Sequence, residues 1–413
     1  MASTVLERFL RFVTYDTQSR EDASTYPSTP GQLTLLRALV DELRDIGVRD
    51  ADIDEHGYVT ATIPATTRKT GVPVIGFIAH VDTSPEMSGA GVKPIVHHAY
   101  DGRDLILPDD PSAVLRAADT PYLADCVGHD IVTASGTTLL GADNKAGVAE
   151  IMAAAERLMR SPEIPHGPIR IAFTPDEEVG HGTKHFNVAR FGARYAYTMD
   201  GGARGELEYE SFSADAMTIT FHGFNTHPGY ARGRMVNAIK LAAKFIDRLP
   251  GDRMSPETTA EREGFVHPYV IDAGVERTAV KLLIRDFDTR QLAAKEEWLR
   301  ELAAGVVRDA PGASIEVTIE ESYRNMREVL DQHPVVVEHA RRAIERAGLT
   351  VKEHPIRGGT DGSRLSFMGL PTPNIFAGEQ NFHSRLEWVS VQDMEKAVDV
   401  IIELAKIWAE ETR

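Results

Sequence analysis

Apolar and polar positions divide the chain into two successive patterns of elements. In the first, short apolar runs typical of buried strands (74–79, 169–173 and 195–199) alternate with helices. Thr4 followed by Glu7 predicts a capped helix at the start of the chain, and apolar residues at helical spacing predict two more helices, one ending at Gly47 and one over 145–159. Alternating strands and helices predict an α/β fold with a buried sheet.

The second pattern occupies 213–322 and has six elements in the order βαββαβ. We expect strands over 217–221, 266–273, 278–287 and 314–320, and helices over 235–249 and 290–307. This order is typical of the ferredoxin-like module. The first pattern then resumes, with a helix opened by Pro334 and a last helix capped by Ser390. We therefore expect one domain of residues 1–212 and 323–413, interrupted by an inserted domain of residues 213–322.

Composition narrows the classes of function. The chain has 45 Lys and Arg against 62 Asp and Glu, a net charge of −17, and one cysteine, Cys126. Such a charge disfavours nucleic acid and anionic lipid, so small molecules or metal cations are the expected partners. The sequence lacks a long apolar run, a recognisable secretion signal and a pair of cysteines for an internal disulfide. We expect a cytoplasmic protein.

Five polar motifs lie at the ends of predicted strands or at the start of a helix. Each has a plain structural interpretation: Asp143 could be a helix N-cap, Asp200 could belong to an Asp-Gly turn, and the others could be solvated loop residues. The candidates are His80 and Asp82, which point to the same side of a strand, then Asp143, the adjacent Glu177 and Glu178, Asp200 and His383.

Taken together, these motifs predict a metal site. The carboxyl ends of strands in an α/β sheet are where ligands bind. If the motifs converge there, three carboxylates and two imidazoles share one cleft, and each buried carboxylate would cost several kcal/mol without counter-charge. Two divalent cations with a bridging hydroxide would balance the charge. Nitrogen and oxygen ligands without a thiolate suit zinc, cobalt or manganese, and Asp82 would orient His80.

The order of these residues resembles that of the M20 family of dinuclear zinc peptidases, and most closely that of its tripeptide aminopeptidases. The resemblance runs nearly from end to end. It rests on the segments His80-Val81-Asp82-Thr83-Ser84-Pro85, Leu140-Gly141-Ala142-Asp143, Thr174-Pro175-Asp176-Glu177-Glu178, His227-Pro228-Gly229 and Ile356-Arg357-Gly358-Gly359-Thr360-Asp361-Gly362. Asn144 departs from the acid that is frequent at this position in those enzymes. The resemblance implies a mixed central sheet flanked by helices, with the inserted domain as a lid and dimerisation domain.

The resemblance also implies roles. Asp143 would bridge two zinc ions, with His80 and Asp200 on one ion and Glu178 and His383 on the other. Glu177 would be the general base that activates a metal-bridging water. A cis peptide bond is expected between Asp143 and Asn144.

Two further residues would bind substrate. His227, in the inserted domain, would reach the substrate carbonyl from its own or a partner subunit. Arg357 would hold the C-terminal carboxylate of the peptide. Without the resemblance, a surface-loop histidine is the favoured interpretation of His227, and an ordinary solvated arginine is an equal alternative for Arg357.

We expect an aminopeptidase that releases the N-terminal residue of tripeptides. Another M20 hydrolase, such as a dipeptidase, a carboxypeptidase or an N-acyl amino acid deacylase, would share the metal chemistry and stays open. A non-catalytic metal-dependent peptide-binding protein is the remaining alternative, although a binding protein would not need a free carboxylate at Glu177.

Overall fold

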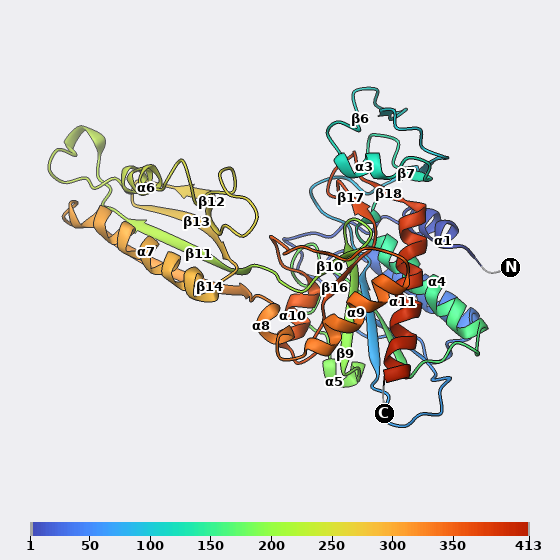
Figure 1. Cartoon of the computed structure of the whole chain (residues 1–413). Coiled ribbons are helices and arrows are strands. Elements are labelled where there is room, and N and C mark those ends of the chain that lie inside the picture. Colours follow the sequence, from blue (N-terminus) through green and yellow to red (C-terminus); the bar gives the residue numbers. More distant parts are fainter. Residues whose placement is uncertain (1–2, 412–413) are drawn as a thin grey trace. The chain divides into compact units, whose positions relative to one another are not determined.

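The computed structural model describes residues 3–411, which form two compact units (Figure 1). Within the described residues, the larger unit comprises 3–209, Glu328–His354 and 360–411, and the smaller one comprises Glu210–Arg327 and Pro355–Gly359. Compared with the predicted insertion of 213–322, the smaller unit therefore begins earlier, ends later and includes a second segment. That segment contains Arg357. It joins the smaller unit through hydrogen bonds to residues that lie much earlier in the sequence.

A mixed sheet of eight strands forms the centre of the larger unit, as predicted. Neighbouring β8, β3, β9 and β16 run parallel, whereas β1 and β2 join one edge in antiparallel fashion and β10 pairs antiparallel with β16. The strands in sheet order are β1 (Asp52–Ile53), β2 (Val59–Ile63), β8 (Ile169–Thr174), β3 (Ile75–His80), β9 (Tyr195–Gly201), β16 (Asn374–Phe376), β10 (Glu206–Glu208) and β15 (Lys352–Glu353).

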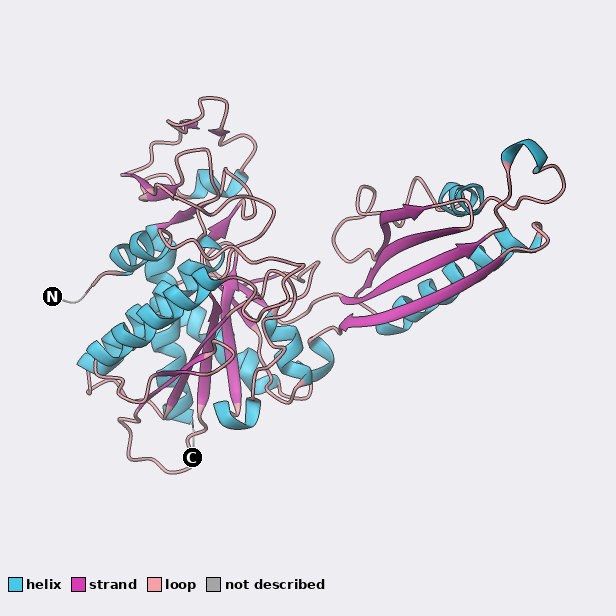
Figure 2. Ribbon diagram, turned by 180° about the vertical axis from the view of Figure 1, so that it is seen from behind, coloured by secondary structure: helices cyan, strands magenta, loops and turns pink. Residues whose placement is uncertain are grey.

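Helices lie on both faces of this sheet (Figure 2). On one side α4 (Ala142–Arg160) packs against β3 and β9, and α11 (Val391–Glu411) packs against α4 and α9 (Pro334–Arg346). A capping box between Thr4 and Glu7 opens the first helix, as predicted. The remaining helices of the larger unit are α1 (Val5–Phe12), α2 (Pro30–Asp45), α3 (Pro121–Asp125), α5 (Val188–Phe191) and α10 (Asp361–Phe367), and α8 (Arg327–Leu330) begins where the chain leaves the smaller unit.

A second sheet, which the apolar pattern did not predict, also belongs to the larger unit. Its strands are too short to show a period: β17 (Glu379–Gln380), β18 (Trp388–Ser390), β7 (Ile131–Thr133) and β4 (Ile95–His97), in that order. A separate two-stranded ribbon joins β5 (Leu105–Ile106) and β6 (Val114–Leu115). The turn between β17 and β18 carries His383, so this sheet places one of the candidate ligands.

The smaller unit has the predicted order of elements. It runs β11 (Ser213–His222), α6 (Ala238–Asp247), β12 (Phe265–Ala273), β13 (Arg277–Asp286), α7 (Thr289–Arg308) and β14 (Ser314–Tyr323), with a short helical turn η1 (Pro228–Tyr230). Its strands form an antiparallel sheet in the order β12-β13-β11-β14. Apolar residues of both helices, among them Phe245 and Leu299, pack with strand residues such as Ile219 and Leu282 into one core. This is the ferredoxin-like arrangement, with helices on one face of the sheet.

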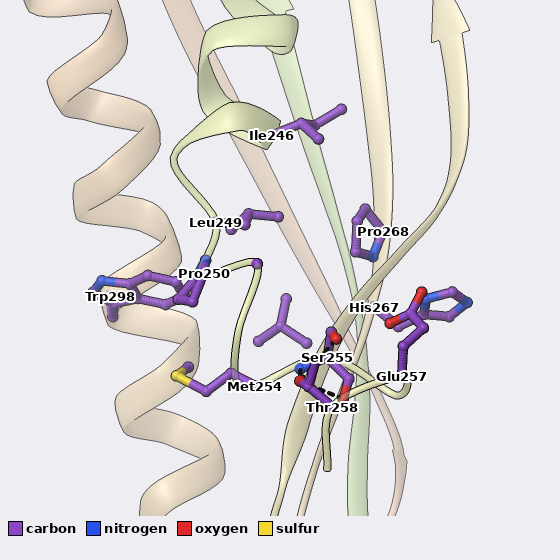
Figure 3. Close-up of a pocket in the computed structure, with 12 residues that line it drawn as sticks. Ile246, Leu249, Pro250, Met254, Ser255, Glu257, Thr258, His267, Pro268 and Trp298 are labelled. Atoms are coloured by element: carbon purple, nitrogen blue, oxygen red, sulfur yellow. Dashed lines mark hydrogen bonds between the residues drawn. The ribbon is translucent and has the colours of Figure 1, made fainter.

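A cavity of about 320 Å³ opens beside this core (Figure 3). Ile246, Leu249 and Trp298 supply part of its apolar lining. Its two hydroxyl side chains, Ser255 and Thr258, lie 3.0 Å apart and hydrogen-bond each other. None of the candidate residues lines it.

Among the helices of residues 3–411, none combines the length and apolar character needed to cross a membrane.

Candidate metal centre and active site

Three neighbouring parallel strands bring the first candidates together. His80 is the last residue of β3, and in the ladder it pairs with Thr174, the last residue of β8, from which the chain continues to Glu177 and Glu178. On the other side of β3, Asp200 lies near the end of β9. The predicted convergence at the carboxyl edge of the sheet is therefore present in the structure.

The five candidate ligands form two groups of three that share Asp143. In the first group, Nε2 of His80 lies 2.9 Å from Oδ1 of Asp143 and 3.4 Å from Oδ1 of Asp200. In the second, Nε2 of His383 lies 3.3 Å from Oδ2 of Asp143 and 2.8 Å from Oε2 of Glu178. Within each group the potential ligand atoms all lie within 4.8 Å of one another. Each group could hold one metal ion, with the two oxygens of Asp143 facing different groups.

The backbone around Asp143 shows why this side chain is not an N-cap. Gly141 occupies the cap position of α4 with φ of +82°, and Asp143 and Asn144 have non-helical dihedral angles inside the first turn. The N-cap interpretation of Asp143 is thus wrong. The peptide bond between Asp143 and Asn144 is cis, which confirms that expectation. The helix then runs so close to β9 that a Cβ atom at Gly147 would lie 2.0 Å from the carbonyl oxygen of Met199.

Asp82 contacts candidate site residues that come from the ends of two strands, β3 and β8. Nδ1 of His80, on the far side of the ring from the ligand atom, hydrogen-bonds the main-chain carbonyl oxygen of Asp82 at 3.1 Å and lies 3.3 Å from its Oδ1. The two carboxylate oxygens of Asp82 also accept hydrogen bonds from the backbone N–H groups of Glu177, at 3.0 Å, and of Glu178, at 3.1 Å. Asp82 is fully buried. It therefore fixes the orientation of His80 and the path of the acidic segment at once.

The adjacent glutamates have different surroundings. Glu178 contacts His383 through Oε2, while its buried Oε1 has no hydrogen-bond partner within residues 3–411, which fits an oxygen that could bind a cation. Glu177 belongs to neither group of potential ligands. Burial raises the pKa of Glu177 well above its usual range, and the charges of Asp361 and Asp200 add to this increase.

The shifted pKa values of the cluster favour bound protons on its side chains when no cation is present. Burial alone would lower the pKa of His383, but its hydrogen bonds to Asp143 and Glu178 raise that pKa to about 11. Burial and the charge of Asp143 raise the pKa of Glu178 to about 8. Burial would raise the pKa of Asp143, yet the hydrogen bonds from His383 and His80 bring it below its usual range. The donor set therefore fits metal ions, since these would replace the bound protons.

The other two candidates, His227 and Arg357, belong to the smaller unit. His227 is exposed at the start of η1, where its Nδ1 accepts a hydrogen bond from the N–H of Gly229 at 3.1 Å. Arg357 donates hydrogen bonds to the carbonyl oxygens of Glu261, at 2.7 Å, and Glu263, at 3.0 Å. Its guanidinium also lies over the ring of Phe212. Arg357 thus ties its own segment to the loop before β12.

Sequence reasoning missed two buried acids beside these ligands. Asp361 accepts a hydrogen bond from the hydroxyl of Thr174 at 2.9 Å. Its negative charge also contributes to the raised pKa of Glu177. Its position inside the glycine-rich segment 356–362 was the available signal. Glu387 accepts hydrogen bonds from the turn that precedes Asp143. The only signal for Glu387 was a lone acid between the apolar residues Leu386 and Trp388.

A model of peptidase family M20/M25/M40 matches residues 136–407. The chain belongs to this family. The resemblance seen in its motifs is thereby confirmed, and as a member of family M20 the chain is a hydrolase of the peptidase class.

Individual M20 relatives match over nearly the whole chain. The sequence is 51% identical to Peptidase T of Geobacillus sp. (strain WCH70) over 408 residues, which cover 99% of both chains. It is 50% identical to Peptidase T of Bacillus subtilis (strain 168) over 406 residues, which cover 98% of both. The fold is similar to that of aminopeptidase PepT from Bacillus cereus ATCC 10987, with a TM-score of 0.75, 25% identity and 98% of each chain covered. A tripeptidase from Staphylococcus aureus gives a TM-score of 0.77 at 22% identity, again over 98% of each chain.

We predict that zinc binding releases protons from this M20 cluster. At pH 7 the cation-free cluster keeps protons on His383 and Glu178, because their pKa values are raised to about 11 and about 8. Metal ligands must be deprotonated, so zinc affinity should fall as the pH falls. Titration calorimetry in two buffers of different ionisation enthalpy should give a net release of at least about one proton per chain.

An equal binding heat in both buffers would contradict this account of the cluster. The matched control is His98→Ala, which removes a largely exposed histidine paired with Asp130 and should leave the number of released protons unchanged.

Proposed function

We propose that this chain is a dinuclear metal-dependent aminopeptidase that releases the N-terminal residue of tripeptides. The main support for this proposal is that two groups of three potential ligands share Asp143. The free carboxyl of Glu177 lies beside them. The relatives named peptidase T and the similarity to a tripeptidase support the choice of substrate. Another M20 solved structure, from Bacillus subtilis, is described as a dinuclear metal binding peptidase.

We propose two Zn²⁺ ions per subunit, with Co²⁺ or Mn²⁺ as workable substitutes, because the donors are imidazole nitrogens and carboxylate oxygens. His80 and Asp200 would hold one ion, Glu178 and His383 the other, and Asp143 both. When bound, the ions supply Lewis-acid polarisation of the scissile carbonyl and lower the pKa of water towards about 7.

The remaining chemistry belongs to the chain's own side chains. Glu177 takes a proton from the attacking water and passes a proton to the departing amine, which is general base and then general acid catalysis. Asp82 keeps His80 in the ligating tautomer and holds the backbone of Glu177 in place. Glu177 is suited to its role because it belongs to neither group of potential ligands, so its carboxylate remains available to accept a proton.

Two residues of the smaller unit would complete substrate binding. His227 is exposed and would donate a hydrogen bond to the substrate carbonyl as negative charge develops on its oxygen. Arg357 would bind the peptide's C-terminal carboxylate, and this requires its guanidinium to exchange at least one of its carbonyl partners, Glu261 and Glu263, for that carboxylate.

We also propose a homodimer formed through the smaller unit, at work in the cytoplasm. β12 is an edge strand, and its residues Tyr269, Val270 and Ile271 are 47%, 41% and 49% exposed. An exposed apolar edge is prone to pair with another chain, here a second copy. Light scattering of the purified protein should give twice the chain mass, and a monomer mass would refute the dimer.

The proposed cytoplasmic location is supported by the single cysteine. Cys126 is buried and free, which suits a reducing compartment.

The substrate proposal predicts a defined order of activities. The zinc-loaded protein should cleave a tripeptide faster than the dipeptide or tetrapeptide of the same series, because the free amine and the carboxylate must both be reached. An N-acetylated tripeptide should not be cleaved. Release of the N-terminal amino acid, followed by chromatography, measures all four rates. Cleavage of the acetylated peptide at a comparable rate would instead indicate a deacylase or a carboxypeptidase.

The two adjacent glutamates should separate catalysis from metal binding. Glu177→Ala should keep both metal ions and lose at least about 10²-fold in kcat, the usual contribution of a general base. Glu178→Ala removes the same charge one residue later and should bind fewer metal ions, because it deletes a ligand of the second group. Metal analysis after dialysis, together with kcat, distinguishes the two variants. Full activity of the Glu177 variant would exclude this residue from the mechanism.

A further inference from the structure

One buried carboxylate, that of Glu387, gathers the backbone that leads into Asp143. Its Oε2 accepts hydrogen bonds from the N–H groups of Leu140 and Gly141, both at 2.7 Å. Its Oε1 accepts a third from the N–H of Asp143 itself, at 3.0 Å. Glu387 is 1% exposed and lies 244 residues further along the chain than Asp143. A single side chain thus organises the turn at the start of α4.

The main chain of Glu387 belongs to a different turn, the one that carries His383. The N–H of Glu387 donates to the carbonyl oxygen of Ser384 at 3.2 Å. The hydroxyl of Ser384 donates in turn to the carbonyl oxygen of Asn381 at 2.6 Å. His383 has a φ of +60°, a left-handed conformation that a residue with a side chain keeps only when its surroundings hold it. The turn between β17 and β18 is therefore closed by bonds that end at Glu387.

The charge of this carboxylate has compensation nearby. Lys145 is 1% exposed, and its ammonium donates to the carbonyl oxygen of Tyr15 at 2.8 Å. A Cβ atom at Gly141 would lie 3.5 Å from Nζ of Lys145, so the ammonium sits beside the turn that Glu387 binds. Hydrogen bonds from three N–H groups and a buried cation offset the cost of burying a carboxylate. These contacts give Glu387 a defined role in holding the backbone that leads into Asp143.

We infer that Glu387 is a positioning residue that sets the spacing between Asp143 and His383, the two ligands on either side of the second metal ion. The inference rests on the proposed metal centre, whose ligands these residues are. The side chain fixes the turn before Asp143, and the main chain fixes the turn after His383. A rigid link between two ligands lowers the cost of arranging them, so its loss should appear as weaker metal binding.

Glu387→Gln is the variant that tests this most sharply. Glutamine has almost the same volume, and its one carbonyl oxygen can still accept from Leu140 and Gly141. Its amide NH₂ group would then face the N–H of Asp143, where two donors meet and no hydrogen bond forms. The variant therefore changes the contact to the bridging ligand and leaves the packing intact.

The experiment is a titration of the metal-free wild-type and variant chains with Co²⁺, followed by visible absorption, with kcat and KM measured on the Co²⁺-loaded proteins. Loss of a residue that orients metal ligands typically costs about 10- to 100-fold in metal affinity. We expect a loss of that size for Glu387→Gln, with an altered Co²⁺ absorption spectrum and with kcat reduced more than KM is raised. Circular dichroism should show an unchanged fold.

The matched control is Glu150→Gln. Glu150 is an equally buried carboxyl on α4, but its two oxygens have no hydrogen-bond partner among residues 3–411. This control should keep its Co²⁺ affinity within about two-fold of the wild type, which separates positioning from the mere loss of a buried acid.

The outcomes distinguish this inference from the proposed function. A wild-type chain that fails to bind two Co²⁺ ions would refute the metal centre itself. If the wild type binds two and Glu387→Gln matches its affinity and spectrum, the inference alone fails. Should the glutamine variant not fold, Glu387→Asp keeps the charge with a shorter reach and is judged by the same measurements. Failure of both variants to fold would make Glu387 a folding residue and overturn the inference.

Discussion

Three carboxylates gathered at one edge of a sheet repel one another, and this repulsion determines what the surrounding fold must supply. Asp143, Glu178 and Asp200 lie in two groups that share Asp143, in a region where burial raises the cost of each negative charge. Protons on the histidines and on Glu178 relieve this cost in the cation-free cluster. Two divalent cations would relieve it more fully, and they would do so only if the ligands stay where the backbone holds them.

The fold holds these ligands through carboxylates that accept from backbone N–H groups. Asp82 binds the N–H groups of Glu177 and Glu178, and Glu387 binds those of the turn into Asp143. Hydrogen bonds with a charged acceptor are stronger than neutral ones, and each fixes a main-chain direction from which a ligand projects. The acidic residues thus serve two purposes: some carboxylates would face the proposed cations, and others fix the backbone behind them.

The sequence predicted the elements with a clear period and the site residues that end them. The strands before His80, Glu178 and Asp200 are predominantly apolar, with interruptions only at Arg170 and Thr198, so the apolar pattern was enough to place their carboxyl ends. Asp143 was ambiguous, because an acid before a helix is usually a cap, and only the left-handed Gly141 and the cis bond after Asp143 set it apart.

Contacts between distant segments could not be predicted in this way. The strands on either side of His383 are two and three residues long, which is too short for any period. The segment with Arg357 joins the smaller unit through bonds to residues more than 90 positions earlier. Glu387 shows no periodic or motif signal at all, since its role depends on a turn that lies almost 250 residues away.

Anomalous diffraction from crystals of the zinc-loaded protein, recorded at the zinc absorption edge, tests directly whether Asp143 joins two metal ions. We expect two peaks in the larger unit, one beside His80 and Asp200 and one beside Glu178 and His383. Each peak should lie about 2.0–2.2 Å from a carboxylate oxygen of Asp143. A single peak, or two peaks of which only one contacts Asp143, would contradict the claim that this aspartate joins two metal ions.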